Sequence, residues 1–283
     1  MLSKKQTTKE QFRSFYQDHK PKNLEDAVEK FAIFAGVEWG EIDTSKDSYE
    51  LIEKLVFQDY RYIRNDITEL TDGLPLYHTI LSAIALGDGK THSVYKRANV
   101  SPQVGDNAVE DLVERGIIKV AASKTGDDKL FFTLPFIRFW FAFVSPIFKG
   151  IRDGEFKEAQ ERWQNKKSDF IAEAFGTLGR EVVKTALKDM QLMKFSHYSD
   201  EQIDLEIYAT TKDKKVIVGS TKYSNAKVKK SELTRLKELC EKADIKPDLF
   251  VIVSKNGFSS ELKAMKGENL KLLTLKNFKN LLE

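Results

Sequence analysis

The sequence predicts an α+β chain of several domains, helical in its first half and mixed α/β in its last third. At 283 residues it is long enough for two or more domains with cores of their own. Apolar residues recur at helical spacing through the first half, whereas Val216–Gly219 and similar short apolar runs near the end are typical of strands. Hydrophobic residues make up 41% and charged residues 31%, as in an ordinary globular protein.

Several classes of protein are disfavoured by the cysteine and apolar content. Cys240 is the only cysteine, which excludes a disulfide framework or a cysteine metal cluster and fits a reducing, cytoplasmic setting. The first residues lack the apolar core of a signal peptide. The longest apolar stretch, Leu134–Phe148, is interrupted by Arg138 and two prolines and is too short to span a bilayer. We therefore expect no membrane partner, and we expect its aromatic residues to form core rather than a base-stacking platform.

Residues 1–73 are predicted to be helical. Asn23 is placed to cap a helix, and Glu25 and Asp26 suit its positive end. A second stretch, 48–70, repeats apolar residues at helical spacing. Nothing in this region predicts a function.

Residues 74–134 have the pattern of a winged helix-turn-helix. Three short helices are predicted at Pro75–Leu86, Thr91–Ala98 and 104–115, and a two-stranded hairpin follows at 117–120 and 129–133. Three helices and a hairpin in that order are the layout of a winged helix-turn-helix.

The third of these helices is acidic, although it is the helix that usually reads DNA in such a fold. Its charged residues are Asp106, Glu110, Asp111, Glu114 and Arg115. Phosphate would be repelled by this helix, so the module is expected to hold a protein partner or to be structural. Five basic residues leave contact with a nucleic-acid backbone open: Lys96, Arg97, Lys119, Lys124 and Lys129.

The remaining chain is predicted as a helical connector over 135–167 and an α/β domain over 168–283. In the latter we expect a helix over 231–243, a strand over 249–254 and a terminal strand over 272–275. Three further segments are distinctive: DKLFFTLPFIRFWFAFVSPIFKGIRDGEF, FIAEAFGTLGREVV and EQIDLEIYATTKDKKVIVGSTKY.

With these segments, the chain from about residue 74 onward resembles the domain of unknown function found carboxy-terminal to archaeal-type AAA ATPases. That resemblance implies a winged helix followed by a PD-(D/E)XK nuclease-like domain built as helix, three strands, helix and strand. The ATPase that usually precedes these domains is not seen here, and residues 1–73 stand in its place.

The resemblance also implies a site. Nucleases of this fold hold a divalent metal with an Asp on one strand and a Glu-x-Lys on the next, often with a glutamate from the first helix. Asp204 and Lys222 match that pattern, but Ser220 stands for the strand glutamate and Gly176 for the helix glutamate. With two of three carboxylates absent, Asp204 remains only a weak metal ligand. We expect no catalytic activity and interpret Asp204 and Lys222 as a leftover ion pair.

A rearranged site is the alternative. Glu206 lies two residues from Asp204 and should share its face of the strand, and Glu181 lies further along the first helix. Either carboxylate could rebuild a Mg²⁺ site, which would make the protein a metal-dependent nuclease. Without such a site no cofactor is expected.

Lysine is concentrated near the expected strands. Seven lysines and one acidic residue lie between residues 212 and 230. Six of them are the predicted nucleic-acid contacts: Lys212, Lys214, Lys215, Lys227, Lys229 and Lys230. The alternative is a solvated strand edge that lysines protect from pairing. The hypothesis is therefore a non-catalytic binding or scaffolding protein that holds nucleic acid by a lysine-rich edge.

Overall fold

A computed structural model describes residues 6–123, 128–199 and 203–283. These residues form two compact units. The helical unit consists mainly of Ser14–Val120 and Asp128–Phe170, and the sheet unit mainly of Ile171–Glu283. One long helix, α10 (Lys157–Ala186), continues from the first unit into the second.

The chain begins with short helices. They are α1 (Thr8–His19), α2 (Leu24–Phe34), α3 (Ser48–Ile52), the π-helical η1 (Glu53–Phe57) and α4 (Tyr60–Leu70). The predicted cap of α2 is confirmed, because the Asn23 side chain accepts a hydrogen bond from the Asp26 backbone N–H at 2.9 Å. This bond satisfies one of the N–H groups that a helix start leaves without a partner.

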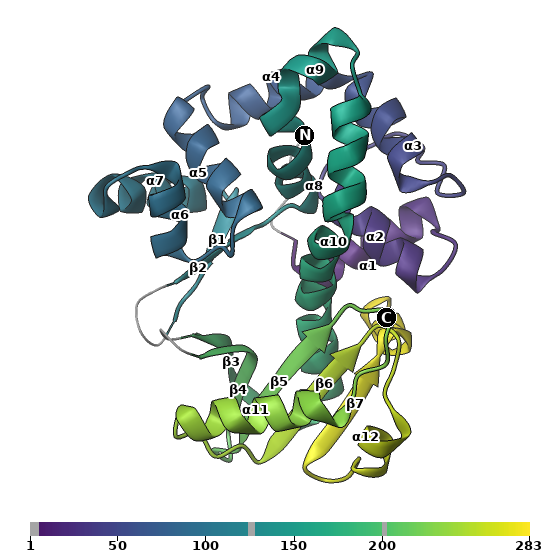
Figure 1. Ribbon diagram of the computed structural model, residues 1–283, viewed down its shortest axis with the longest axis vertical. Coiled ribbons are helices and arrows are strands. Elements are labelled where there is room, and N and C mark those ends of the chain that lie inside the picture. Colours follow the sequence, from purple (N-terminus) through teal and green to yellow (C-terminus); the bar gives the residue numbers. More distant parts are fainter. Residues whose placement is uncertain (1–5, 124–127, 200–202) are drawn as a thin grey trace. The chain divides into compact units, whose positions relative to one another are not determined.

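Three helices and a hairpin follow in the expected order. They are α5 (Pro75–Leu86), α6 (Thr91–Ala98), α7 (Pro102–Glu114), β1 (Ile118–Ala121) and β2 (Lys129–Phe132) (Figure 1). Helix α7 begins two residues earlier than predicted. Ser101 caps it by accepting from the Val104 N–H, and Pro102 takes the first turn, where its missing N–H costs nothing.

The aromatic-rich segment is buried, as predicted. It forms α8 (Pro135–Phe139), the π-helical η2 (Trp140–Val144), the 3₁₀ turn η3 (Ser145–Ile147) and α9 (Phe148–Asp153). Phe136, Phe139, Trp140, Phe141 and Phe143 are each at most 4% exposed. These rings pack against one another in the core of the helical unit, so they are not available for stacking on bases.

A five-stranded mixed sheet dominates the second unit. Its strands stand in the order β3 (Leu192–Ser199), β4 (Asp204–Thr211), β5 (Val216–Lys222), β6 (Leu249–Ser254) and β7 (Leu270–Thr274) (Figure 1). The pairs β3–β4 and β4–β5 are antiparallel, and the pairs β5–β6 and β6–β7 are parallel. Strand β6 has the predicted bounds, and β7 begins two residues before the expected position.

Helices cover both faces of this sheet. On one face the second half of α10 packs with Phe175 against Phe278 of η5 (Leu275–Leu281), ring centroids 5.0 Å apart. On the other, α11 (Lys230–Lys242) and α12 (Ser260–Ala264) bury Leu236 and Leu262 over β5 and β6. Cys240 is part of this core, as its amphipathic helix predicted.

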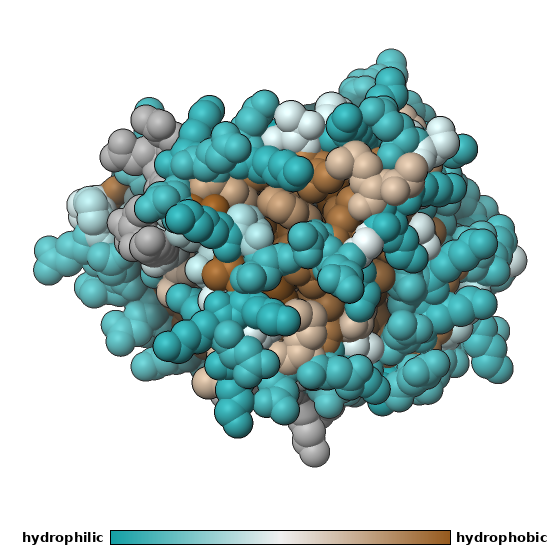
Figure 2. Space-filling model, turned by 90° about the horizontal axis from the view of Figure 1, so that it is seen from below, coloured by the Kyte–Doolittle hydropathy of each residue, from teal (hydrophilic) through white to brown (hydrophobic). Residues whose placement is uncertain are grey.

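The expected boundary at residue 168 falls inside a helix. Helix α10 runs unbroken through this position, and the change of unit comes near residue 170. The expected winged-helix and connector segments lie in the same compact unit as most of the helices before them. No helix of the described residues is both long enough and apolar enough to cross a membrane. The face in Figure 2 shows mostly hydrophilic side chains around a smaller apolar area.

Candidate site on strand β5

Strand β5 presents its polar residues to opposite faces of the sheet. Ser220 and Lys222 face α11, where the Ser220 hydroxyl donates to Glu232 at 2.8 Å and the Lys222 ammonium lies 3.1 Å from the same carboxylate. Thr221, between them, faces α10 at Gly176 and Gly179. The i, i+2 pair predicted from sequence therefore shares a face, but its partner is a glutamate of α11.

Glu232 is the centre of this cluster. It is 11% exposed, and besides Ser220 and Lys222 it accepts from the Arg235 guanidinium at 2.7 Å. Burial by itself would raise the pKa of Glu232. The hydrogen bonds from Arg235 and Ser220 and the charges of Lys222 and Arg235 outweigh burial, so its pKa lies below the ordinary value. The Lys222 ammonium is thus paired within the fold.

Glu206 lies on the other face of the sheet. Its carboxylate accepts from the backbone N–H of Thr221 at 2.7 Å and from the Thr221 hydroxyl, and the Arg180 guanidinium is 3.9 Å away. A Cβ atom at Gly176 would lie 2.7 Å from this carboxylate. The glycine that stands for the expected helix glutamate therefore leaves the room that Glu206 occupies.

An irregularity in β4 turns Glu206 toward α10. Between Tyr208 and Leu205, two residues of β4 lie opposite a single residue of β3, His197, which is a β-bulge. Because the bulge shifts the alternation of faces, Tyr208 and Leu205 both pack into the core beneath α11. Glu206 is left facing α10 and Thr221.

The predicted ion pair between Asp204 and Lys222 is not formed. Asp204 Oδ1 lies 3.1 Å from Nε2 of the buried His197 on β3, and half of the Asp204 side chain is exposed. Lys222 is instead paired with Glu232 on α11. The two residues have different partners because α11 supplies a carboxylate that the sequence pattern did not include.

The carboxylates of the expected site do not converge. Glu181 pairs with Lys184 of its own helix at 2.7 Å, so each of Asp204, Glu206, Glu181 and Glu232 has a different set of partners. Within the ranges that the structure describes, no three His, Cys, Asp or Glu side chains are grouped so as to hold a metal ion. The arrangement gives β5 internal ion pairs and hydrogen bonds on both faces.

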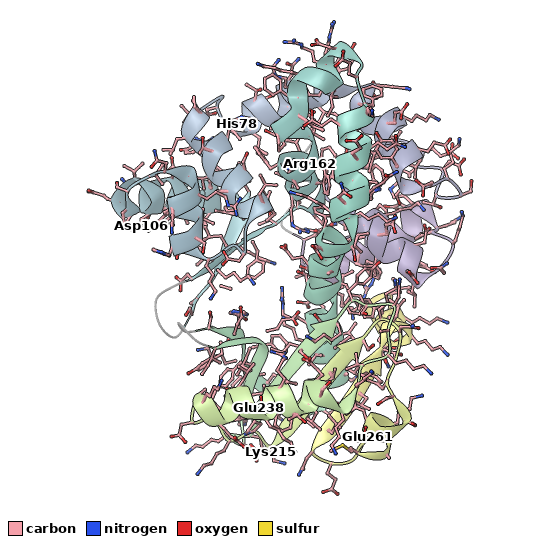
Figure 3. All side chains as sticks on the ribbon, viewed as in Figure 1. His78, Asp106, Arg162, Lys215, Glu238 and Glu261 are labelled. Carbon is pink, nitrogen blue, oxygen red and sulfur yellow. The ribbon has the colours of Figure 1, made fainter. Side chains whose placement is uncertain are left out.

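The six lysines do not form one edge, which corrects the expectation. They fall into two clusters at opposite ends of β5: the amino-end lysines Lys212, Lys214 and Lys215, and the carboxyl-end lysines Lys227, Lys229 and Lys230. The strand between them has 7 residues. At about 3.3 Å per residue it separates the clusters by about 20 Å. Lys215 stands at the turn before β5 (Figure 3).

The carboxyl-end lysines belong to a loop that is hydrogen-bonded to its neighbour. The loops after β5 and β6 are joined through Val228, whose N–H donates to Gly257 at 3.0 Å and whose carbonyl accepts from Ser259 at 2.9 Å. Lys255 donates to the Asn225 side chain at 2.8 Å and lies 4.5 Å from the centre of the Tyr223 ring. A basic surface with an aromatic ring thus lies where two parallel strands end.

The acidic helix α7 uses part of its charge inside the fold. The Tyr95 hydroxyl donates to Asp106 at 2.8 Å, and the Tyr77 hydroxyl donates to Asp111 (Figure 3 labels Asp106). These bonds tie α7 to α6 and α5. Glu110 and Glu114 are exposed, so they are the acids that this helix offers to a partner.

Sequence reasoning missed three partners in this site. Glu232 has a signal in the sequence, an acid in the first turn of a helix, but that position is usually explained by the helix dipole. His197 and Thr221 have no signal, since their roles depend on the bulge in β4 and on which helix covers which face.

The comparisons with known proteins identify a domain without assigning a function. Residues 140–235, about a third of the chain, match the model of DUF234, a family described as "Archaea bacterial proteins of unknown function". No curated protein matches the chain. A domain of unknown function is thus confirmed in the part of the chain where the resemblance placed one.

One solved structure is similar in part. The crystal structure of protein VC1899 from Vibrio cholerae aligns with 74% of this chain at 14% sequence identity and a TM-score of 0.29. The chain covers 55% of that protein, so it spans about half of its length.

Proposed function

We propose that this chain is a non-catalytic binding protein with a winged helix and a degenerate PD-(D/E)XK nuclease-like domain, and that the carboxyl-end lysines hold nucleic acid. The order of elements supports the nuclease-like assignment: helix α10, strands β3, β4 and β5, helix α11 and strand β6. The order α5, α6, α7, β1 and β2 supports the winged helix.

The observation that best supports a non-catalytic role is the ion pair between Lys222 and Glu232. A catalytic lysine must be free to position water or to neutralise charge beside a metal. The Lys222 ammonium instead lies 3.1 Å from Glu232, on the face of β5 opposite to Glu206. Metal ligands on one face and the lysine on the other cannot act on one phosphate.

The carboxyl-end lysines are the better of the two clusters for nucleic acid. Lys255 and the Tyr223 ring, 4.5 Å apart, lie at the same end of β5 and β6, and aromatic rings among basic side chains are typical of surfaces that bind single strands. Among the ion pairs between described residues, only Lys230 of this cluster has a partner, Glu261 at 3.4 Å with both side chains more than half exposed. Exposed pairs of this kind are weak and exchange readily for phosphate.

The winged helix is proposed to contact protein. Glu110 and Glu114 face solvent on α7, so a nucleic-acid backbone would be repelled from this helix, whereas a basic protein surface would be attracted.

The test is nucleic-acid retention by two matched triple variants. Lys227→Glu/Lys229→Glu/Lys230→Glu reverses the carboxyl-end lysines, and Lys212→Glu/Lys214→Glu/Lys215→Glu reverses the same number of charges about 20 Å away. Binding to fluorescent single-stranded and duplex DNA is followed by anisotropy across a range of salt. We expect the first variant to weaken binding about 10-fold or more and to lower the salt slope by about two to three, because lost phosphate contacts reduce counterion release.

The amino-end variant is the control for net charge. It should weaken binding less than 3-fold, since a general electrostatic effect is screened within about 10 Å at ordinary salt. Equal losses in the two variants would reject a local site at the carboxyl-end lysines. An absence of binding by the unchanged protein at low salt would reject nucleic acid as the ligand.

A further inference from the structure

The helical unit contains an apolar cavity that the site on β5 does not use. Its volume is about 540 Å³, within the range of about 300–1,000 Å³ found for small-molecule sites. Its most buried lining residues are Ile67 of α4 and Phe136 and Ile137 of α8, each at most 3% exposed. The rest of the apolar lining is Val37, Trp39, Ile63 and Leu70.

The wall formed by the loop after α2 is held in place. The Trp39 indole N–H donates to the Phe34 carbonyl at 2.6 Å, and its ring meets the Phe136 ring edge-on at 5.0 Å. Gly36, with φ of 93°, starts this loop, and a Cβ atom there would lie 2.9 Å from the Leu134 side chain. A wall fixed in this way loses little conformational freedom when a ligand binds.

All charged residues that line the cavity are acidic. Glu38 comes from the loop after α2, and Asp66 and Glu69 come from α4, so carboxylates stand on two sides of the cavity. All three are exposed, and none belongs to an ion pair found between described residues. No Lys, Arg or His is in the lining. Three like charges around an apolar space attract a cation and repel an anion.

We propose that this cavity binds a small organic cation. An apolar or aromatic body would fill the space over Phe136 and Ile137, and an ammonium group would lie among Glu38, Asp66 and Glu69. Trp39 adds a ring that can attract the same charge. A neutral apolar ligand would gain nothing from the carboxylates. The proposal does not depend on the nucleic-acid function.

Three probes of matched size and different charge test the proposal: phenethylamine, phenethyl alcohol and hydrocinnamate. Each is titrated into the full-length chain, with tryptophan fluorescence and calorimetry as readouts. We expect the amine to bind about 10-fold more tightly than the alcohol and the carboxylate to bind most weakly, because the three share a phenethyl body and differ in the charge of the head group. Equal binding of amine and alcohol would overturn the proposal, as would the absence of any binding.

Isosteric variants locate the bound charge. Asp66→Asn/Glu69→Gln should lower the affinity for phenethylamine about 10-fold, to that of the alcohol. The matched control, Glu158→Gln/Glu161→Gln on α10, removes two exposed carboxylates of the same unit that do not line the cavity and should leave the affinity unchanged. Thermal melts establish that both variants are folded. Retention of the amine preference by the first variant would contradict the proposal. If a Leu/Lys peptide binds to the protein and phenethylamine does not, the ligand of this cavity is a protein segment and not a small organic cation.

Discussion

At the scale of single residues, Glu232 determines what the polar side chains of β5 can do. Its carboxylate takes the Ser220 hydroxyl, the Lys222 ammonium and the Arg235 guanidinium at distances of 2.7–3.1 Å. Glu232 is 11% exposed, so its carboxylate would be costly to leave without cations, whereas Lys222 and Arg235 keep 37% and 44% of their side chains exposed. Lys222 therefore has a carboxylate partner within the fold as long as Glu232 is ionised.

The first prediction concerns the variant Glu232→Gln. At pH 7 we expect a loss of about 2 kcal/mol in the free energy of unfolding, because charge-assisted hydrogen bonds become neutral ones. The pKa of Glu232 is lowered in the folded protein, so its contribution is complete above the unfolded value near 4.5 and is lost as pH falls below it. Urea unfolding at pH 7 and at pH 3.5 measures the difference between protein and variant, which should shrink at the lower pH.

Glu238→Gln provides the control, because Glu238 is exposed on the same helix (Figure 3). It should change the free energy of unfolding by less than about 0.5 kcal/mol at either pH. A cost for Glu232→Gln that is the same at both pH values would mean that packing, and not charge, is what Glu232 contributes.

At the scale of elements, β5 needs its glycine. A Cβ atom at Gly219 would lie 2.2 Å from the carbonyl oxygen of Val251 on the neighbouring strand β6. Backbone atoms of a central strand cannot move aside without breaking the ladder between β5 and β6. The apolar run that precedes Ser220 therefore ends in glycine for a reason of packing.

The second prediction is that Gly219→Ala destabilises the sheet unit by about 3 kcal/mol, at the upper end of what overpacking costs. Gly267→Ala is the matched control, because nothing lies within 4 Å of a Cβ atom there and its φ is not positive. It should leave stability nearly unchanged. Urea unfolding followed by circular dichroism compares the two, and equal stabilities would show that β5 and β6 can separate slightly at this point.

Elements were easier to predict than their contacts. The bounds of β6 and the buried segment 135–147 follow from apolar runs, and Asn23 marks the start of α2, whereas the cap of α7 at Ser101 was not predicted. Alternation along β5 predicts that Ser220 and Lys222 share a face of the sheet. The alternation does not distinguish the two faces, so it does not predict which helix covers the one with Ser220 and Lys222. The bulge in β4 has no signal in the sequence either, because Asp204–Ile207 alternate polar and apolar residues as a regular strand does.

At the scale of the whole molecule, residues close in sequence act in different places. The lysines between 212 and 230 look continuous in sequence, but β5 separates them into two ends. Asp204 and Lys222, matched to one pattern, pair with His197 and Glu232. The charged side chain on β5, Lys222, therefore has a partner within the fold, and the two lysine clusters lie beyond the ends of the strand.

The last prediction is that the protein does not cut DNA or RNA in Mg²⁺ or Mn²⁺. Asp204 and Glu206 are the two carboxylates of β4, but Glu206 is held by Thr221 and Arg180 and is not free to bind a metal. Asp204 alone would bind Mg²⁺ weakly, because this ion dehydrates reluctantly and requires several oxygen ligands. Labelled single-stranded and duplex substrates would be incubated with the protein and resolved on denaturing gels, alongside Asp204→Asn, Glu206→Gln and the exposed control Asp213→Asn.

Cleavage that both β4 variants abolish and the control retains would establish the rearranged nuclease in place of the binding protein. Cleavage that persists in all three would come from elsewhere in the chain or from a contaminant, which repeated purification would separate.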